Sequence, residues 1–236
     1  MEMNQYYWGG YYLVKPTYLS RCINDRKVPS KVYTVSDCIC DIFPSTWALP
    51  WVTSRDWELE RAKSVFGILD FDSIHTHLNQ LFDQELFGWP NVICDLKTAH
   101  TIYNGYLRNI EDIKLLAIGL PTQYMDEVLE DLQPGEGQGS SGLFLNLSKR
   151  ILLDCTKELG FDVLGLDYPS LHSHLCHGIN YEICDEYSIP TNIHGFIDSF
   201  AEAEKLAEVL LEPQSGAEPA FWLPWKVVEL PLAATD

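Results

Sequence analysis

The chain is short of basic residues and has no long apolar run. Of its 236 residues, 16 are lysine or arginine and 34 are aspartate or glutamate, so the net charge is −18 at pH 7. Such a charge repels nucleic acid and anionic membrane surfaces. No stretch approaches the roughly 18 uninterrupted apolar residues of a membrane span, and the N-terminal residues lack the basic and apolar regions of a signal peptide. We therefore expect a cytoplasmic protein with no nucleic-acid partner and no membrane association.

The cysteines include no Cys-x-x-Cys pair. There are seven of them, an odd number, and they are irregularly spaced. This pattern argues against a disulfide framework and favours free thiols in a reducing cytosol. Cys38 and Cys40 would point to the same side of a strand, where they could bind a metal or form a redox pair. The ordinary role of free cysteine is a small buried side chain.

Motifs for catalysis and nucleotide binding are also missing. No Gly-x-Ser-x-Gly elbow is present. The segment Gly137-Gln-Gly-Ser-Ser-Gly142 resembles a phosphate cradle superficially, but it lacks the lysine of a P-loop and follows a predicted helix rather than a strand. The sequence therefore predicts no cofactor, assigns no catalytic residue and favours a protein that is not an enzyme.

Apolar residues are abundant in spite of the charge, since 46% of the chain is hydrophobic. A disordered acidic tail would not carry so many core-forming residues, so we expect a folded protein. The acidity is uneven: the net charge is +3 over residues 1–35, −6 over residues 36–114 and −15 over residues 115–236. The C-terminal half should project a negative field that speeds encounter with basic partners.

Strand-like runs predict the sheet of an α+β fold, mixed or antiparallel. They lie near residues 31–40, 113–120, 161–166 and 226–230. The nearly all-apolar run at 113–120 is typical of a central strand covered on both faces. The last run begins at Phe221 and is predicted to be an edge or closing strand, because Pro224 cannot donate within a ladder.

Helical periodicity predicts four to six helices packed on this sheet. Apolar residues recur at helical spacing, with capping residues ahead of them, over residues 53–66, 72–82, 95–107, 122–132 and 199–211. Asp95 is the expected cap of the third helix, and Ser199 with Glu202 forms a capping box at the last. We expect one domain over residues 1–236, with a hinge or flexible loop at residues 134–142.

A histidine cluster is the densest group of potential metal ligands. It consists of His172, His174 and His177. On a helix only 174 and 177 share a face, and on a strand only 172 and 174 do, so a site that uses all three needs an irregular backbone or remote ligands. The more ordinary interpretation is that these histidines satisfy hydrogen bonds near a helix start after Pro169 and Ser170.

Other titratable residues add alternatives. His75 and His77 lie about 200° apart around their predicted helix, so they cannot chelate one ion together. Carboxylates surround the histidine cluster in sequence, which leaves a metal-assisted hydrolase as an alternative. Their usual role is a solvated surface. They are Asp162, Asp167, Glu182, Asp185 and Glu186.

Two predicted helices carry the acidic side chains that we expect to attract a basic partner. We assign this role to three residues of each helix, on the faces away from the apolar stripes. They are Glu127, Glu130 and Asp131 on the first helix and Glu204, Glu208 and Glu212 on the second. The second set falls on one i, i+4 ridge, where like charges are mutually destabilising unless something compensates them.

Three stretches of the chain resemble known proteins. They are Phe87-Gly-Trp-Pro-Asn-Val92, residues 164–178 (LGLDYPSLHSHLCHG) and residues 217–225 (AEPAFWLPW). They resemble uncharacterised soluble bacterial proteins that are similar to the immunity proteins of polymorphic toxins. The resemblance implies an inhibitor that neutralises a basic toxin by occluding its active site. That class shares no catalytic residues, so the resemblance assigns no site.

Two alternatives remain open. One is a metal-dependent hydrolase centred on the histidine cluster, and the other is a scaffold protein that pairs with a cytosolic complex. Metal analysis of the purified protein distinguishes a metal-dependent hydrolase from an inhibitor. A scaffold protein predicts no toxin gene beside this one, so the neighbouring genes distinguish it from an immunity protein.

Overall fold

A seven-stranded antiparallel sheet forms the centre of the protein. The computed structural model describes residues 5–18, 31–36, 71–133, 141–154, 157–167, 170–175 and 189–232. In spatial order the strands are β4 (Phe87–Gly88), β5 (Val92–Ile93), β1 (Tyr6–Val14), β6 (Lys114–Pro121), β9 (Phe221–Leu230), β7 (Glu158–Asp167) and β8 (Ser170–Ser173). Two further strands, β2 (Thr17–Tyr18) and β3 (Lys31–Val32), pair separately.

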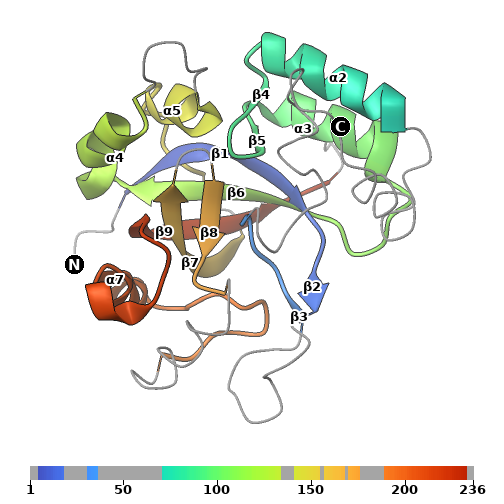
Figure 1. The fold of residues 1–236 in the computed structure, drawn as a ribbon. Coiled ribbons are helices and arrows are strands. Elements are labelled where there is room, and N and C mark those ends of the chain that lie inside the picture. Colours follow the sequence, from blue (N-terminus) through green and yellow to red (C-terminus); the bar gives the residue numbers. More distant parts are fainter. Residues whose placement is uncertain are drawn as a thin grey trace.

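Five α-helices pack around the sheet in the described residues, and this confirms the predicted α+β fold (Figure 1). The helices are α2 (Phe71–Asp83), α3 (Leu96–Ile102), α4 (Met125–Asp131), α5 (Gly142–Leu147) and α7 (Phe200–Leu210). A π-helical turn at Tyr103–Leu107 extends α3, and a 3-10 turn at Thr122–Tyr124 precedes α4. The predicted helices over 72–82, 95–107, 122–132 and 199–211 are confirmed.

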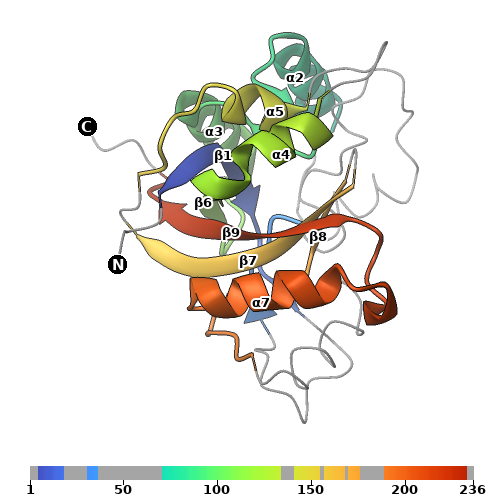
Figure 2. The same ribbon diagram turned by 90° about the vertical axis from the view of Figure 1, so that its left-hand side faces the viewer.

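Alternation along the strands gives the sheet two apolar faces. Leu116 and Ile118 of β6 pack in one cluster with α4 and α5, whereas their neighbour Leu115 packs in another with α2 and α3. Phe161 and Trp222, on β7 and β9, pack against α7. In Figure 2 the strands β6, β9 and β7 run between α4 above and α7 below. The run predicted as a central strand is therefore buried on both faces, as expected.

The prediction of an edge strand at the C-terminus is wrong. Strand β9 lies inside the sheet, between β6 and β7. Its pairing with β7 covers Phe221–Val228, but its pairing with β6 begins only at Lys226. At Pro224 the strand therefore has one neighbour, so its backbone is locally that of an edge, where a missing N–H is tolerated.

Strand β1 was not predicted, because two glycines interrupt its apolar pattern. A bulge between Trp8 and Gly10 shifts the register with β6. Gly10 has a φ of 150° there, and a Cβ on it would clash with Val92. Gly160 plays the same part at the bulge in β7, with a φ of 122° and only 2.7 Å between an added Cβ and the Ile197 carbonyl oxygen.

Several predictions fall partly or wholly outside the residues that the structure describes. Of the run at 31–40 the structure describes residues 31–36, and within these Lys31–Val32 forms a strand that pairs with β2 outside the main sheet. Cys38 and Cys40, the predicted helix over 53–66 and residues 134–140 of the predicted hinge lie outside the described residues. The strands before and after the predicted hinge, β6 and β7, both pair with β9.

Candidate functional site

Five of the six predicted acidic residues lie on α4 and α7, two helices at the same side of the protein, and the sixth, Glu212, follows α7. Both α4 and α7 face the viewer in Figure 2. Five of the six side chains are exposed, and the sixth, Glu204, is half-buried. We call the set Glu127, Glu130, Asp131, Glu204, Glu208 and Glu212 the acidic face.

A hydrogen bond joins the two halves of the acidic face. The Tyr124 hydroxyl donates to Glu204 Oε1 at 2.6 Å, and Gln123 Nε2 donates to the same oxygen at 3.2 Å. Burial, together with the hydrogen bond to the Glu204 carboxylate, raises the pKa of Tyr124 to about 12, so the hydroxyl keeps its proton. Tyr124 therefore fixes the start of α4 against α7.

The sequence did not point to this link. Tyr124 and Gln123 lie in the 3-10 turn ahead of α4, and their partner Glu204 is 80 residues away from Tyr124. Nothing in local periodicity relates two such positions, because periodicity reports on one element at a time.

Two details of α7 differ from the prediction. Ser199 is the N-cap residue, but its side chain makes no cap hydrogen bond, so the expected capping box does not form. The helix ends at Leu210, which leaves Glu212 outside the predicted ridge. Glu212 instead precedes a 3-10 turn (Pro213–Ser215), where its carboxylate accepts a hydrogen bond from Gln214.

A basic side chain interrupts the acidic surface on α4. Arg150 donates to Asp126 Oδ1 at 2.6 Å, and both side chains are at least half exposed. The guanidinium also lies over the Tyr7 ring, 6.0 Å from its centroid. Asp126 is therefore partly neutralised, whereas no ion pair joins Glu127, Glu130 or Asp131 to a basic side chain within the described ranges.

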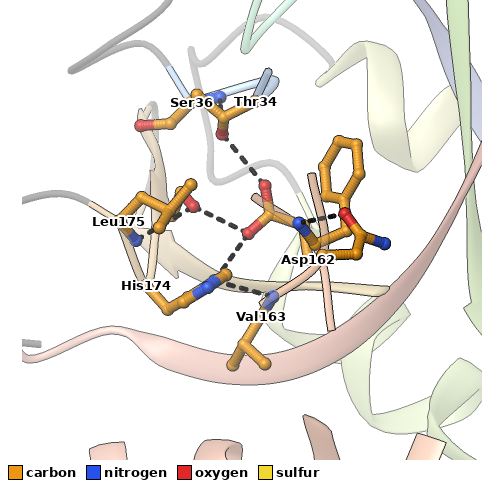
Figure 3. A network of polar contacts seen from close by, with 9 residues as sticks. Thr34, Ser36, Asp162, Val163, His174 and Leu175 are labelled. Carbon is orange, nitrogen blue, oxygen red and sulfur yellow. Dashed lines mark hydrogen bonds and ion pairs between the residues drawn. The ribbon is translucent and has the colours of Figure 1, made fainter. Parts of the chain in front are cut away.

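The second arrangement of polar side chains is a buried network around Asp162 on β7 (Figure 3). Asp162 is fully buried, and its carboxylate contacts three polar side chains. His174 Nδ1 lies 2.9 Å from Oδ1, Ser173 Oγ donates to Oδ1 at 2.7 Å, and Thr34 Oγ1 donates to Oδ2 at 2.9 Å. The network thus ties Thr34 to the hairpin of β7 and β8 around one carboxylate.

The His174 ring makes two polar contacts through Nδ1. This nitrogen lies 2.9 Å from Asp162 Oδ1 and 3.4 Å from the backbone nitrogen of Val163. The tautomer decides the roles, since a protonated Nδ1 donates to Asp162 and an unprotonated one accepts from Val163. The other ring nitrogen, Nε2, is buried and has no hydrogen-bond partner.

The structure changes the interpretation of the histidine cluster. Residues 170–173 form strand β8 rather than the start of a helix, with His172 half-buried on that strand and His174 just beyond it. His177 lies outside the described residues. In the part of the chain that the structure describes, no three histidine, cysteine or carboxylate side chains are grouped to hold a metal ion.

The other pair of histidines that the sequence singled out, His75 and His77, have separate partners. His75 lies 3.4 Å from Asn79 Nδ2, and His77 lies 3.1 Å from the Tyr106 hydroxyl, which agrees with their prediction as independent residues. The interpretation of Asp162 as a solvated carboxylate is wrong, because it is buried. Its position inside the apolar run of β7 was the available signal, since a charge in such a run needs buried partners.

Comparison with known proteins gave no match to a family model, a curated protein or a solved structure. Within the described residues no helix is both long enough and apolar enough to cross a membrane.

Proposed function

We propose that this protein binds a basic protein through the acidic face and acts as a stoichiometric inhibitor, an immunity protein that occludes the active site of a basic toxin. The observation that carries the proposal is the bond between Tyr124 and Glu204, which holds the acidic residues of α4 and α7 on one side of the molecule. Carboxylates gathered on one side attract a cationic surface more strongly than the same number spread evenly.

The chemistry of the partner follows from the sign of the charge. An enzyme that acts on an anionic substrate, such as a nuclease, has a cationic active-site cleft. A rigid surface of carboxylates meets such a cleft quickly, because opposite charges steer the encounter, and it excludes the substrate by occupying the same cleft. This mode of action needs no catalytic group on the inhibitor. The resemblance of three sequence stretches to proteins like immunity proteins favours the same function.

The test begins with purification of the natural partner from the host, followed by kinetics of its binding. The double variant Glu130→Lys and Glu208→Lys reverses one charge on each helix of the acidic face. We expect its association rate to fall at least about tenfold at low ionic strength, and the dependence of that rate on salt to flatten. Stopped-flow fluorescence at several salt concentrations measures both quantities.

A matched control separates a local effect from one of net charge. Asp83→Lys and Glu111→Lys change the net charge by the same amount at exposed positions away from the acidic face. Asp83 ends α2, and Glu111 precedes β6 at the end opposite to α4. The control should leave the association rate within about twofold of the parent protein. Equal slowing by both double variants, or the absence of a basic partner, would contradict the proposal.

A further inference from the structure

A cavity of about 420 Å³ is lined by residues 94–96, at the start of α3, and by residues of the segment 149–154. Its floor is the part of the sheet between the helix clusters, where Trp8, Ala117 and Leu230 come from β1, β6 and β9. The Trp8 and Tyr11 rings pack against each other with centroids 4.9 Å apart. A volume of this size is typical of sites that enclose a large side chain or a small ligand.

The rim of the cavity is unusually apolar for a protein surface. Ile151 and Leu152 line it with exposed fractions of 51% and 52%. Their backbone is held in place, because Trp8 N donates to the Ile151 oxygen at 2.7 Å and Leu153 N donates to the Tyr6 oxygen at 2.9 Å. Rigid apolar groups beside a concave aromatic floor are characteristic of the centre of a protein interface.

Two polar groups that line the cavity, the Trp8 indole N–H and the Asp154 carboxylate, are available to contact a partner. The Trp8 Nε1–H is buried and has no hydrogen-bond partner. Asp154, exposed at the rim, forms no ion pair with the basic side chains that the structure describes. Lys149 also lines the cavity, where its ammonium lies 5.8 Å from the Trp8 ring centroid and contacts Asn146 Oδ1.

The segment that forms the rim of the cavity is joined to α4 by an ion pair. Arg150 immediately precedes the apolar rim, and its guanidinium is bonded to Asp126 on α4. A partner that contacts both the carboxylates of α4 and the rim at Ile151 and Leu152 would cross the surface at this ion pair. Charged groups around an apolar, concave centre match the division of protein interfaces into a rim and a core.

We infer that this cavity receives an aromatic or aliphatic side chain from the basic partner, with a neighbouring lysine or arginine of that partner paired to Asp154. The inference rests on the proposed function, and it adds the site at which the partner is anchored. Steering by the acidic face sets the rate of encounter, whereas the anchor in the cavity slows dissociation.

Three capped tripeptides test the inference without the natural partner. One has phenylalanine between two arginines, the second has alanine between two arginines, and the third has phenylalanine between two glutamates. We expect the first to bind about tenfold more tightly than the second, because it buries a ring. It should also shift the indole N–H resonance of Trp8 in a nitrogen–proton correlation spectrum, and the glutamate peptide should bind least.

A pair of leucine variants provides the control. Leu152→Ser should weaken binding of the arginine–phenylalanine peptide at least about threefold, whereas Leu211→Ser should not change it. Leu211 is 49% exposed but lies at the end of α7, away from the cavity. Equal binding of the phenylalanine and alanine peptides, or an unshifted Trp8 resonance, would overturn the inference.

The outcomes distinguish this inference from the proposed function. If the glutamate peptide binds as tightly as its arginine counterpart, the cavity accepts apolar groups without regard to charge, and a basic occupant is excluded. Binding of the arginine–alanine peptide reports on the acidic face alone, and it should be lost with Glu130→Lys and Glu208→Lys. Suppose that this charge-reversed variant loses the arginine–alanine peptide, while the parent protein binds the phenylalanine and alanine peptides equally. The inference about the cavity is then wrong, and the proposed role of the acidic face is supported.

Discussion

At Asp162 a single carboxylate contacts polar side chains from two segments that are distant in sequence. Thr34, Ser173 and His174 come from positions up to 140 residues apart in sequence, yet all reach one buried charge. Burying an ionised group is costly unless hydrogen bonds compensate it, so each donor contributes to the stability of the whole arrangement. The unpartnered Nε2 of His174 marks the least satisfied atom of the network.

The variant Thr34→Val tests this dependence at the residue scale. Valine matches threonine in shape but removes the hydroxyl that donates to Asp162 Oδ2 and accepts from Ser36 N. We expect the free energy of unfolding to fall by about 1–3 kcal/mol, because a buried carboxylate oxygen loses its donor. Urea denaturation measures the change. Ser148→Ala, which removes an exposed hydroxyl, is the control and should cost less than about 0.5 kcal/mol. Equal costs would contradict the role assigned to Thr34.

Elements with strong local signals were predicted correctly from the sequence, whereas their neighbours in the sheet were not. The helix after Asp95 and the strand at 113–120 follow from a cap and an apolar run, and both are confirmed. Strand β1 was missed because its bulge interrupts the alternation at Gly9 and Gly10. The interior place of β9 could not be derived, because it depends on where pairing with β6 begins, which no local pattern records.

The candidate site also has features that could be predicted from the sequence and features that could not. The acidic residues of α4 and α7 could be proposed from sequence, because a helical period separates a polar face from an apolar one. Their proximity could not, because it depends on the contact between Tyr124 and Glu204. The histidine cluster drew attention to His174, but its main partner, Asp162, looked like one more surface carboxylate.

Glu229 offers a test at the scale of elements, since it joins three parts of the sheet. It lies on β9 and binds Lys114 of β6 at 2.9 Å and Lys157, just before β7, at 2.7 Å. Burial alone would raise the pKa of Glu229, but the hydrogen bonds and charges of the two lysines outweigh it and lower the pKa below its usual value. A lowered pKa stabilises the fold above the pKa of the unfolded chain, and this contribution is lost as the pH falls through the folded value.

We therefore expect Glu229→Gln to lower the free energy of unfolding by about 1 kcal/mol at pH 7 and by progressively less as the pH falls below the usual range of a glutamate pKa. Denaturant unfolding of both proteins across these pH values measures the difference. Glu130→Gln, at an exposed position on α4, should differ from the parent by less than about 0.5 kcal/mol throughout. A cost for Glu229→Gln that persists in acid would mean that packing, rather than charge, accounts for it.

At the scale of the whole molecule, the net charge of −18 acts against the fold. Like charges on a compact surface repel one another, and salt screens this repulsion over a Debye length of about 10 Å at 0.1 M. Salt also weakens the ion pairs, but those among the described residues are few beside the excess of carboxylates, and exposed pairs contribute little. The melting temperature should therefore rise by a few degrees between about 0.02 M and about 0.3 M NaCl.

The two double variants test whether binding depends on the acidic face in particular or only on the net charge of the protein. Each reduces the net charge equally, so both Glu130→Lys with Glu208→Lys and Asp83→Lys with Glu111→Lys should raise the melting temperature at low salt by similar amounts. Only the first pair should slow association with the partner, because only it removes charge from the acidic face. Such a result would mean that carboxylates are kept on α4 and α7 at a cost in stability because they serve binding. If low-salt stability is unchanged in both variants, repulsion among the carboxylates does not limit the fold.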